Sequence, residues 1–263
     1  MDSFADERDF KLLEQDRYTF FVLNRIMKGE HTLFFTDHEK LILFYTCAPF
    51  PTWIWTPDGV PDEEKARAFA LAKENGLIDG KHNFNLKYEL AEYFMERARD
   101  EGIDLRIKTN MFAYDCPDPI HPSYEADGAI HCCTLDDVDE LVEFMDMFHV
   151  ETEVDRQDRD TYRKNAQGII ETGRMYFWKN AQGQSVACCK YAPDGDMASI
   201  NLVFTHPDFR RKHYAENLVY QVTMLAKEEG YLAMLYTDAD YVASNACYEK
   251  IGYILRGKLC TIG

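Results

Sequence analysis

Apolar and polar residues follow two different spacings along the chain, and these spacings predict an alternation of helices and strands. In the first half, apolar positions at helical spacing predict a helix over residues 10–27. Two apolar runs on either side of the polar stretch 37–40 predict a β-hairpin, and the short strand TWIWT follows it. The stretches DEEKARAFALAKENG and NLKYELAEYFMERARDEG are predicted helices that each end at a glycine, and IDLRIKTNMFAYD is a predicted strand.

The second half shows the same alternation in a clearer form. After the short strand AIHCCT, the stretch TLDDVDELVEFMDMFH predicts an amphipathic helix, with Thr134 as N-cap and Asp137 at the N3 position. A helix over 160–171, a hairpin of GRMYFWKN and SVACCKYAP, and the strand MASINLVFTH come next. Helix, strand, helix and strand are then predicted for YAENLVYQVTMLAKEEG, YLAMLYTD, VASNACYEKIG and YILRGKLCTI. A strand, loop, helix and strand over 197–238 require a parallel crossover, so we predict an α/β fold with a mixed sheet.

The segment CPDPIHPSYEADG separates the two halves. It contains three prolines, three acidic residues and a glycine, which is a composition typical of a linker. We therefore place a domain boundary next to Gly128 and divide the chain into residues 1–127 and 128–263. A chain of 263 residues is long enough for two modest domains.

Acidic residues outnumber basic ones, which restricts the partners to be expected. A formal net charge of −17 repels nucleic acid and anionic membranes at long range, so we expect neither as a partner. The same charge mildly favours a cationic or amine substrate. The acidic N-terminus lacks the apolar region of a signal peptide, and no apolar run could span a bilayer, so we expect a cytoplasmic location.

The eight cysteines show no metal-binding or disulfide pattern. None belongs to a C-x-x-C pair, and the adjacent pairs 132–133 and 188–189 fall in predicted strands, where neighbouring side chains point to opposite faces. We therefore expect buried free thiols in a reducing compartment, and no metal site.

A basic segment between a strand and a helix is the main candidate for ligand binding. Arg210, Arg211 and Lys212 follow the strand MASINLVFTH and directly precede the next helix. A helix N-terminus offers unpaired N–H groups and the positive end of the helix dipole, which suits a pyrophosphate. On this evidence by itself, a basic triplet is more often a solvated turn.

Two motifs around this segment resemble the GNAT superfamily of acyl-CoA-dependent N-acetyltransferases. In that family, a loop of pattern Gln/Arg-x-x-Gly-x-Gly/Ala opens a helix after a splayed strand. Residues 210–215 match at the first and last positions but carry His213 in place of the glycine. The second signature, an Asn followed by a Tyr and then a Gly-aromatic pair, is matched by SNACYEKIGY, and the strand INLVFTHP is also similar. The resemblance covers residues 128–263 and implies a GNAT-like fold.

The resemblance also implies roles for individual residues. The backbone of Leu202, Val203 and Phe204 would pair with the pantetheine arm of acetyl-CoA, and a backbone N–H near Val203 or Phe204 would polarise the thioester carbonyl. Asn245 would contact the CoA arm, and Tyr248 would lie near the sulfur and protonate the leaving thiolate. The residues implied to bind the pyrophosphate are Arg210, Arg211, Lys212, His213, Tyr214 and Ala215.

Several of these roles have a structural alternative. Tyr248 could be a packed core tyrosine and Asn245 only a helix-start residue, whereas Gly252 is expected to be the C-cap of the short helix in either case. If the backbone at His213 needs a positive φ, histidine adopts it with some strain, and if it needs only αR, the loop keeps its N–H at no cost.

The general base is weakly marked in the sequence. The predicted loop FHVETEVDRQD offers Glu151 and Glu153, either of which could remove a proton from an ammonium directly or through water. A solvated acidic loop is the alternative for each of them.

The first half repeats the order of elements and resembles the degenerate GNAT-like domain that precedes the active one in some relatives. The loop after WIWT is acidic at Asp58, Asp62, Glu63 and Glu64, where a phosphate would need cations. We therefore expect this half not to bind CoA. Trp53 and Trp55 lie on one face of a strand, where core packing is the default interpretation and a pocket wall the alternative.

These observations predict an N-acetyltransferase that transfers an acetyl group from acetyl-CoA to a primary amine of a small molecule or peptide, by direct attack on the thioester. A non-catalytic CoA-binding module, with a phosphate loop weakened by His213, is one alternative. A purely structural tandem fold is another. The sequence identifies no acceptor, and it leaves the oligomeric state, including a homodimer, open.

Overall fold

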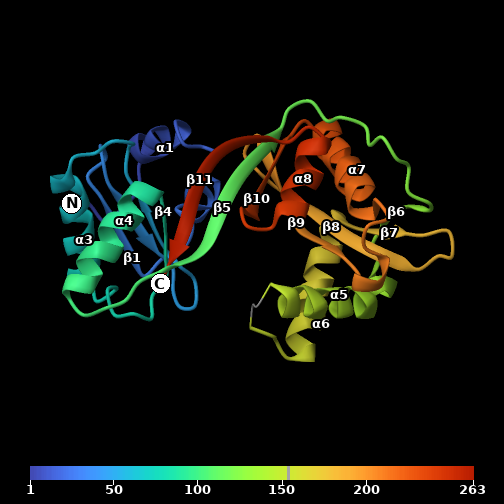
Figure 1. Cartoon of the computed structure of the whole chain (residues 1–263), viewed down its shortest axis with the longest axis horizontal. Helices are drawn as coiled ribbons and strands as arrows, with labels where there is room; N and C mark the ends of the chain where they lie inside the picture. The colour runs from blue at the N-terminus through green and yellow to red at the C-terminus, as the bar shows by residue number, and fades with distance from the viewer. Residues whose placement is uncertain (153–154) are drawn as a thin grey trace. The chain divides into compact units, whose positions relative to one another are not determined.

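The computed structural model describes residues 1–152 and 155–263 and divides into two units (Figure 1). Unit 1 comprises Met1–Tyr114, Tyr236–Tyr241 and Leu255–Gly263, and unit 2 comprises Asp115–Leu235 and Val242–Ile254. Each unit has helices packed on a β-sheet with both parallel and antiparallel strand pairs. The predicted mixed α/β fold is therefore confirmed.

Unit 1 is built on a sheet in which three antiparallel strands are followed by a helix and a parallel strand. Its helices are α1 (Glu7–Glu14), α2 (Phe21–Ile26), α3 (Asp62–Glu74) and α4 (Tyr88–Asp100). Its strands are β1 (Leu33–Thr36), β2 (Ile42–Tyr45), β3 (Thr52–Trp55), β4 (Phe84–Leu86), β5 (Ile107–Cys116) and β11 (Ile254–Ile262). Strands β1, β2 and β3 are antiparallel neighbours, β4 runs parallel to β3, and β11 pairs antiparallel with β4.

Side-chain alternation along β2 and β3 supplies an apolar core on each face of this sheet. Leu43 and Ile54 belong to the cluster formed with α3 and α4. Trp53 and Trp55 belong to the opposite cluster, formed with α1 and α2, and the indole of Trp55 donates a hydrogen bond to Asp16 at 2.8 Å. Both tryptophans are at most 5% exposed, so core packing is confirmed as their role.

Unit 2 repeats the same plan with longer strands. Its helical segments are η1 (Leu135–Asp137), α5 (Val138–Glu151), α6 (Arg159–Glu171), η2 (Pro207–Phe209), α7 (Tyr214–Glu228) and α8 (Val242–Lys250). Its strands are β6 (Ala129–Cys132), β7 (Met175–Lys179), β8 (Ser185–Asp194), β9 (Met197–Thr205) and β10 (Leu232–Asp238), in the order β10-β9-β8-β7-β6. Strands β6 to β9 are antiparallel neighbours and β10 is parallel to β9, which confirms the predicted crossover through α7.

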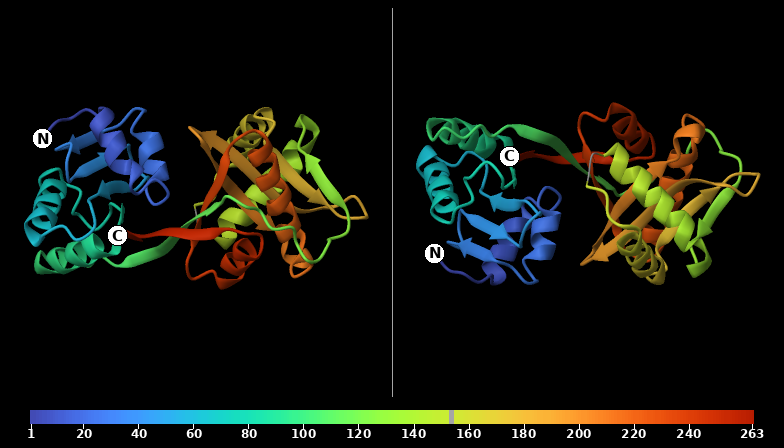
Figure 2. Two further views of the ribbon diagram at one scale, coloured as in Figure 1. Left: turned by 90° about the horizontal axis from the view of Figure 1, so that it is seen from above. Right: turned by 90° about the horizontal axis from the view of Figure 1, so that it is seen from below.

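Helices cover both faces of the unit 2 sheet. Figure 1 shows α5 and α6 on one face and α7 and α8 on the other, and the two views in Figure 2 look onto these faces in turn. Cys188 packs in the apolar cluster under α5 and α6, whereas Cys189 lies near Cys247 of α8. The adjacent cysteines therefore point to opposite faces, as predicted. All eight cysteines are free.

Local sequence explains the main elements and also two errors in the prediction. The capping box of Thr134 and Asp137 is present before α5. The predicted helix over 10–27 is wrong as a continuous element, because α1 already ends at Glu14 and turn residues lead to Phe20, after which α2 starts. Strand β4 was missed, because its three residues, which are apolar, polar and apolar and lie directly before a helix, are too few to show a period of two.

The last strand, β11, belongs to unit 1 by its contacts, although it follows α8 of unit 2 in the sequence. The boundary next to Gly128 stays a prediction. No helix among the described residues is long and apolar enough to cross a membrane.

Candidate functional site

The loop between β9 and α7 presents a row of backbone donors. His213 is the N-cap of α7 and has φ 63° and ψ 10°, in the left-handed region, and Arg211 also has a positive φ of 61°. Within the described residues, no acceptor is bonded to the backbone N–H groups of residues 211–215. A helix N-terminus with free N–H groups and adjacent cations is a suitable anion site. These donors fit the pyrophosphate implied by the sequence.

The side chain of His213 is held by neighbouring residues of unit 2. The ring of Tyr124 stacks on the imidazole, with centroids 4.8 Å apart and planes at 26°. The Nδ1 atom lies 3.1 Å from Oε2 of the buried Glu216. Asn217 donates hydrogen bonds to the carbonyl oxygens of both Tyr124 and His213, each at 2.9 Å. The linker is thus fastened to the first turn of α7, and the position that needs a positive φ is filled by a histidine.

Tyr214 fastens the same linker at a second point. Its hydroxyl donates a hydrogen bond to Oδ1 of Asp127 at 2.5 Å, and Oδ2 of Asp127 accepts from the backbone N–H of Ala181 at 2.9 Å. Burial and the Asp127 hydrogen bond raise the pKa of Tyr214 to about 12, and the same hydrogen bond lowers the pKa of Asp127. The tyrosine side chain therefore supports the loop, and its backbone N–H is the group left available to a ligand.

Arg210 links the loop to the end of α5. Its guanidinium forms an ion pair with Glu151, the candidate base, and also lies over the ring of Phe204 at 5.8 Å. The structure therefore brings together a candidate phosphate-binding residue and a candidate base, a pairing that the sequence did not predict. Glu153, the other candidate base, lies outside the described residues.

A β-bulge interrupts β9 at the residues expected to bind the pantetheine arm. Cys188 of β8 pairs with Phe204, and Lys190 pairs with Asn201, so Leu202 and Val203 together oppose a single residue of β8. Leu202 has a positive φ of 51°. A bulge leaves ladder groups unpaired and turns the strand, which is how a backbone N–H becomes available to a ligand. The bulge was not visible in the sequence, because it contains no glycine.

Helix α8 places Asn245 and Tyr248 on its buried face, three residues apart. Burial raises the pKa of Tyr248 above its usual value of 10.0, and the thiols of Cys247 and Cys189 add to the shift. The phenol therefore keeps its proton at neutral pH. Cys189 is the β8 residue opposite the bulge, so Tyr248 lies on the α7 and α8 side of that position.

The end of α8 fixes the orientation of Tyr248. Gly252 has φ 98°, and its N–H donates to the carbonyl of Glu249, while the N–H of Tyr253 donates to the carbonyl of Tyr248. This pair of bonds is the Schellman motif, which favours glycine at the left-handed position. The predicted C-cap role of Gly252 is confirmed.

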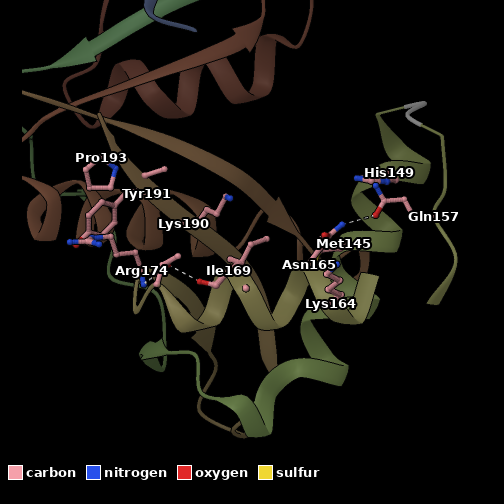
Figure 3. A pocket seen from close by; sticks show the side chains of 13 residues that line it. Met145, His149, Gln157, Lys164, Asn165, Ile169, Arg174, Lys190, Tyr191 and Pro193 are labelled. Atoms are coloured by element: carbon pink, nitrogen blue, oxygen red, sulfur yellow. Dashed lines mark hydrogen bonds between the residues drawn. The ribbon is translucent and has the colours of Figure 1, made fainter. Parts of the chain in front are cut away.

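A groove with a volume of about 510 Å³ lies on the face of the sheet that α5 and α6 cover (Figure 3). Figure 3 shows Met145 and His149 at one end and Tyr191 and Pro193 at the other, with Lys190 between them. The remaining lining residues are Gln157, Lys164, Asn165, Gly168, Ile169, Thr172, Arg174 and Ala192. The groove is separate from the loop, but the last turn of α5 reaches both, through His149 and Glu151.

Unit 1 contains a partly buried cluster of acidic residues around a buried histidine. Ligand atoms of Asp6, Asp9 and His38 lie within 4.8 Å of one another, a spacing that could hold a metal ion. The imidazole of His38 already bonds to Asp9 at 2.8 Å and to Asp2 at 2.9 Å, and Thr36 donates to Asp9 at 2.6 Å. Hydrogen bonds that fasten the N-terminus account for this cluster without an ion.

The geometry agrees with the comparisons to known proteins. Residues 140–253 match the model of the acetyltransferase (GNAT) family. A GNAT-family acetyltransferase from Colwellia psychrerythraea aligns with 99% of this chain and 98% of its own, with a TM-score of 0.62 and 10% identity. GCN5-related N-acetyltransferases from Sphaerobacter thermophilus and Kribbella flavida give TM-scores of 0.67 and 0.59 at 11% and 13% identity, over 99% and 97% of this chain and 94% of each of theirs. No curated protein gives a significant sequence match.

The family model thus identifies residues 140–253 as an acetyltransferase (GNAT) domain. The matched residues lie in the second half of the chain, which also contains the loop between β9 and α7, the bulge in β9, and helix α8 with Tyr248. The structural likenesses extend over nearly the whole chain and confirm a tandem GNAT-like fold.

Proposed function

We propose that this protein is an N-acetyltransferase that uses acetyl-CoA and transfers its acetyl group to a primary amine. The observation that carries the proposal is the row of free backbone N–H groups at residues 211–215, beside the cations of the loop and inside a GNAT family domain. These donors would hold the pyrophosphate. Acetyl-CoA would supply an activated thioester for attack by the amine.

The remaining site residues would act on two atoms of the thioester, its carbonyl oxygen and its sulfur. A backbone N–H at the bulge, from Val203 or Phe204, would donate to the thioester carbonyl oxygen as negative charge develops there. Tyr248 would donate its proton to the leaving sulfur, since the phenol is protonated at neutral pH. Asn245, on the same helix face, would contact the CoA arm.

The ion pair between Glu151 and Arg210 affects when Glu151 could act as the general base. Phosphate oxygens bound at the loop would compete for the guanidinium of Arg210 and release Glu151. In this scheme, binding of the acetyl donor precedes activation of the base.

Calorimetric titration with acetyl-CoA, followed by a screen of primary amines for CoA release, tests the proposal. Absence of binding at near-millimolar acetyl-CoA would refute it. Binding without turnover of any amine would favour a CoA-binding module instead.

Variants test the individual roles. Tyr248→Phe should lower kcat by on the order of 10²-fold with little change in acetyl-CoA affinity, because it removes only the proton donor. Tyr231→Phe, a tyrosine of unit 2 outside the site, is the matched control. Full activity in Tyr248→Phe would exclude the general-acid role. Glu151→Gln should lower kcat while tightening acetyl-CoA binding, since Arg210 loses its internal partner.

A further inference from the structure

The last turn of α5 places a histidine in the groove, on the side of the groove that packs toward the bulge of β9. His149 lines the groove beside Met145 (Figure 3). Leu202, the bulge residue with the positive φ, packs against the apolar cluster that contains Met145. The residue before the histidine, Phe148, packs its ring against the ring of Phe204 in β9, with centroids 6.2 Å apart. An amine at this end of the groove would therefore lie between the imidazole and the expected position of the thioester.

A chain of hydrogen bonds fixes the orientation of this imidazole. Its Nδ1 atom lies 2.9 Å from the hydroxyl oxygen of Tyr162, which is buried. Tyr162 also forms a hydrogen bond with Asp146, three residues before His149 on α5. Arg156 donates to both carboxylate oxygens of Asp146, at 2.6 and 2.5 Å. The chain of contacts thus leads from an ion pair at the surface, through a buried phenol, to the imidazole in the groove.

The donors and acceptors of this chain allow one arrangement of protons. Hydrogen bonds from Arg156 hold the pKa of Asp146 below its usual value, and the hydrogen bond from Tyr162 adds to this effect. The carboxylate can only accept, so the single hydroxyl proton of Tyr162 points to Asp146 and the phenol oxygen accepts from Nδ1–H of His149. In the neutral imidazole, the lone pair is then on Nε2. Among the residues that the structure describes, none bonds to Nε2.

Other charged groups surround the imidazole and come from several elements. They are Asp146 and Glu151 on α5, Arg156 in the segment before α6, Lys164 on α6 and Lys190 on β8. Each of them can influence a pH profile. An effect of His149 must therefore be separated from theirs by substitution and by spectroscopy of the imidazole itself.

Acetylation of an ammonium removes two protons from its nitrogen, so two groups can act as acceptors. The first proton leaves before attack, because only the neutral amine has a lone pair. The second leaves the positively charged nitrogen of the tetrahedral adduct. Glu151 is held by Arg210 at the phosphate loop, whereas the Nε2 lone pair belongs to a residue that lines the groove. The imidazole is thus the better placed of the two for the first proton.

We propose that His149 is the proton acceptor that takes the first proton from the ammonium of the acceptor, and that Tyr162 is the positioning residue that orients it. The inference rests on the proposed acetyl transfer and adds a residue to it. A candidate base on the same turn, Glu151, keeps the later step.

The protons and electron pairs of this scheme balance. The ammonium gives a proton to Nε2, directly or through one water, and the pair of the broken N–H bond attacks the thioester carbonyl carbon. The C–S bond then breaks, its electron pair stays on sulfur, and sulfur takes the proton of Tyr248. The nitrogen gives its second proton to Glu151, and solvent returns a proton to Tyr248. One proton is released overall for each amide formed.

The tautomer of His149 tests its orientation without any substrate. In protein labelled with nitrogen-15 histidine, long-range proton–nitrogen correlation spectra distinguish a ring nitrogen that carries a proton from one that carries a lone pair, and His149→Gln assigns the signal. At a pH where the imidazole is neutral, we expect the proton on Nδ1. Tyr162→Phe removes the acceptor of that proton and should shift His149 toward the Nε2–H form. An Nε2–H tautomer in the wild type would overturn the proposal.

Kinetics with benzylamine, 4-aminobutan-1-ol and 1,4-diaminobutane test the role in the reaction. His149→Gln should lower kcat by on the order of 10²-fold and leave acetyl-CoA affinity unchanged, because it removes only a proton acceptor. An imidazole base gives the pH profile of kcat/KM an acidic limb near neutral pH. In His149→Gln this limb should be absent, and the rate should keep rising toward the pKa of the amine. His131→Gln, a histidine of unit 2 that bonds to Asp137 outside the groove, is the matched control and should keep both rate and limb.

The outcomes separate this inference from the proposed function. Wild-type kcat and an unchanged acidic limb in His149→Gln would overturn the inference and leave acetyl transfer intact. Tyr162→Phe should lower kcat by less than His149→Gln does, with KM unchanged, and thermal melts check that each variant is folded. Failure to bind acetyl-CoA would refute the proposed function instead, and the tautomer would still decide whether His149 is oriented as a base.

Discussion

The left-handed backbone of His213 makes a sharp prediction about the phosphate loop. Its φ of 63° is already the conformation that a glycine would adopt, and the imidazole is held by Tyr124 and Glu216. The loop geometry is therefore in place without glycine. Replacing the histidine with glycine should leave acetyl-CoA affinity within about threefold of wild type, a change of roughly 0.65 kcal/mol.

Opposing contributions decide how His213→Gly changes the free energy of unfolding. The left-handed conformation costs a non-glycine residue about 1 kcal/mol, which His213→Gly would recover. The substitution loses a stacked aromatic pair worth about 0.5–1.5 kcal/mol and a partly buried polar contact worth about 0.5 kcal/mol. It also adds unfolded-state entropy worth about 0.5–1 kcal/mol. His213→Gly should therefore be destabilising by about 1 kcal/mol in spite of its better backbone preference.

A series of substitutions at His213 separates the effect of the backbone conformation from the effect of the side chain. His213→Asn keeps a residue that tolerates the left-handed region, whereas His213→Val introduces a β-branched residue that does not. Urea unfolding and acetyl-CoA calorimetry on the series should rank valine worst in both, with affinity lowered about tenfold as the N–H groups lose their alignment. Equal affinity for the asparagine and valine variants would refute the requirement for a positive φ. A tenfold gain with glycine would show instead that the imidazole obstructs the phosphates.

Three further predictions follow from other contacts. Tyr124→Ala should weaken acetyl-CoA binding by about threefold, measured by calorimetry, because the ring that holds His213 is lost; an unchanged affinity would contradict this. Gly252→Ala should cost about 3 kcal/mol in urea unfolding, because the new Cβ would lie 2.6 Å from a backbone oxygen, against about 1 kcal/mol for Gly230→Ala, which has a similar φ and open space. His38 is subject to burial, which opposes protonation, but hydrogen bonds to carboxylates outweigh it and raise the pKa of His38 above 6.5. Its stabilising contribution is complete below about pH 6.5 and is lost as the pH rises through the folded-state pKa, so wild type should lose more stability than His38→Asn between pH 6 and 9; parallel curves would rule this out.

Much of the fold was predictable because the signals are local. The amphipathic period of α5, the capping box at Thr134 and the crossover through α7 depend on residues close together in sequence. The errors lie where local signals are short or conflict. Strand β4 has three residues, and the break between α1 and α2 interrupts an apolar pattern that would otherwise suit one helix.

The candidate site was predictable to a smaller extent. Its motifs located the loop and the helix of Tyr248, because a helix N-terminus and a capped helix have recognisable sequences. Neither the bulge at Leu202 nor the groove had a recognisable signal in the sequence. A bulge without glycine depends on strand pairing, and the lining of a groove depends on which faces of α5, α6 and β8 meet.

The sequence by itself determined most of the element order, the motifs that resemble the GNAT family, and a histidine at the position where the GNAT loop pattern has glycine. It left open what conformation that histidine adopts, since φ at a loop residue depends on contacts with segments far along the chain. Tertiary structure decided this by bringing Tyr124 and Glu216 to the ring. It also decided the pairing of Glu151 with Arg210 and the cationic lining of the groove, because charges distant in sequence acquire partners only when the chain is folded.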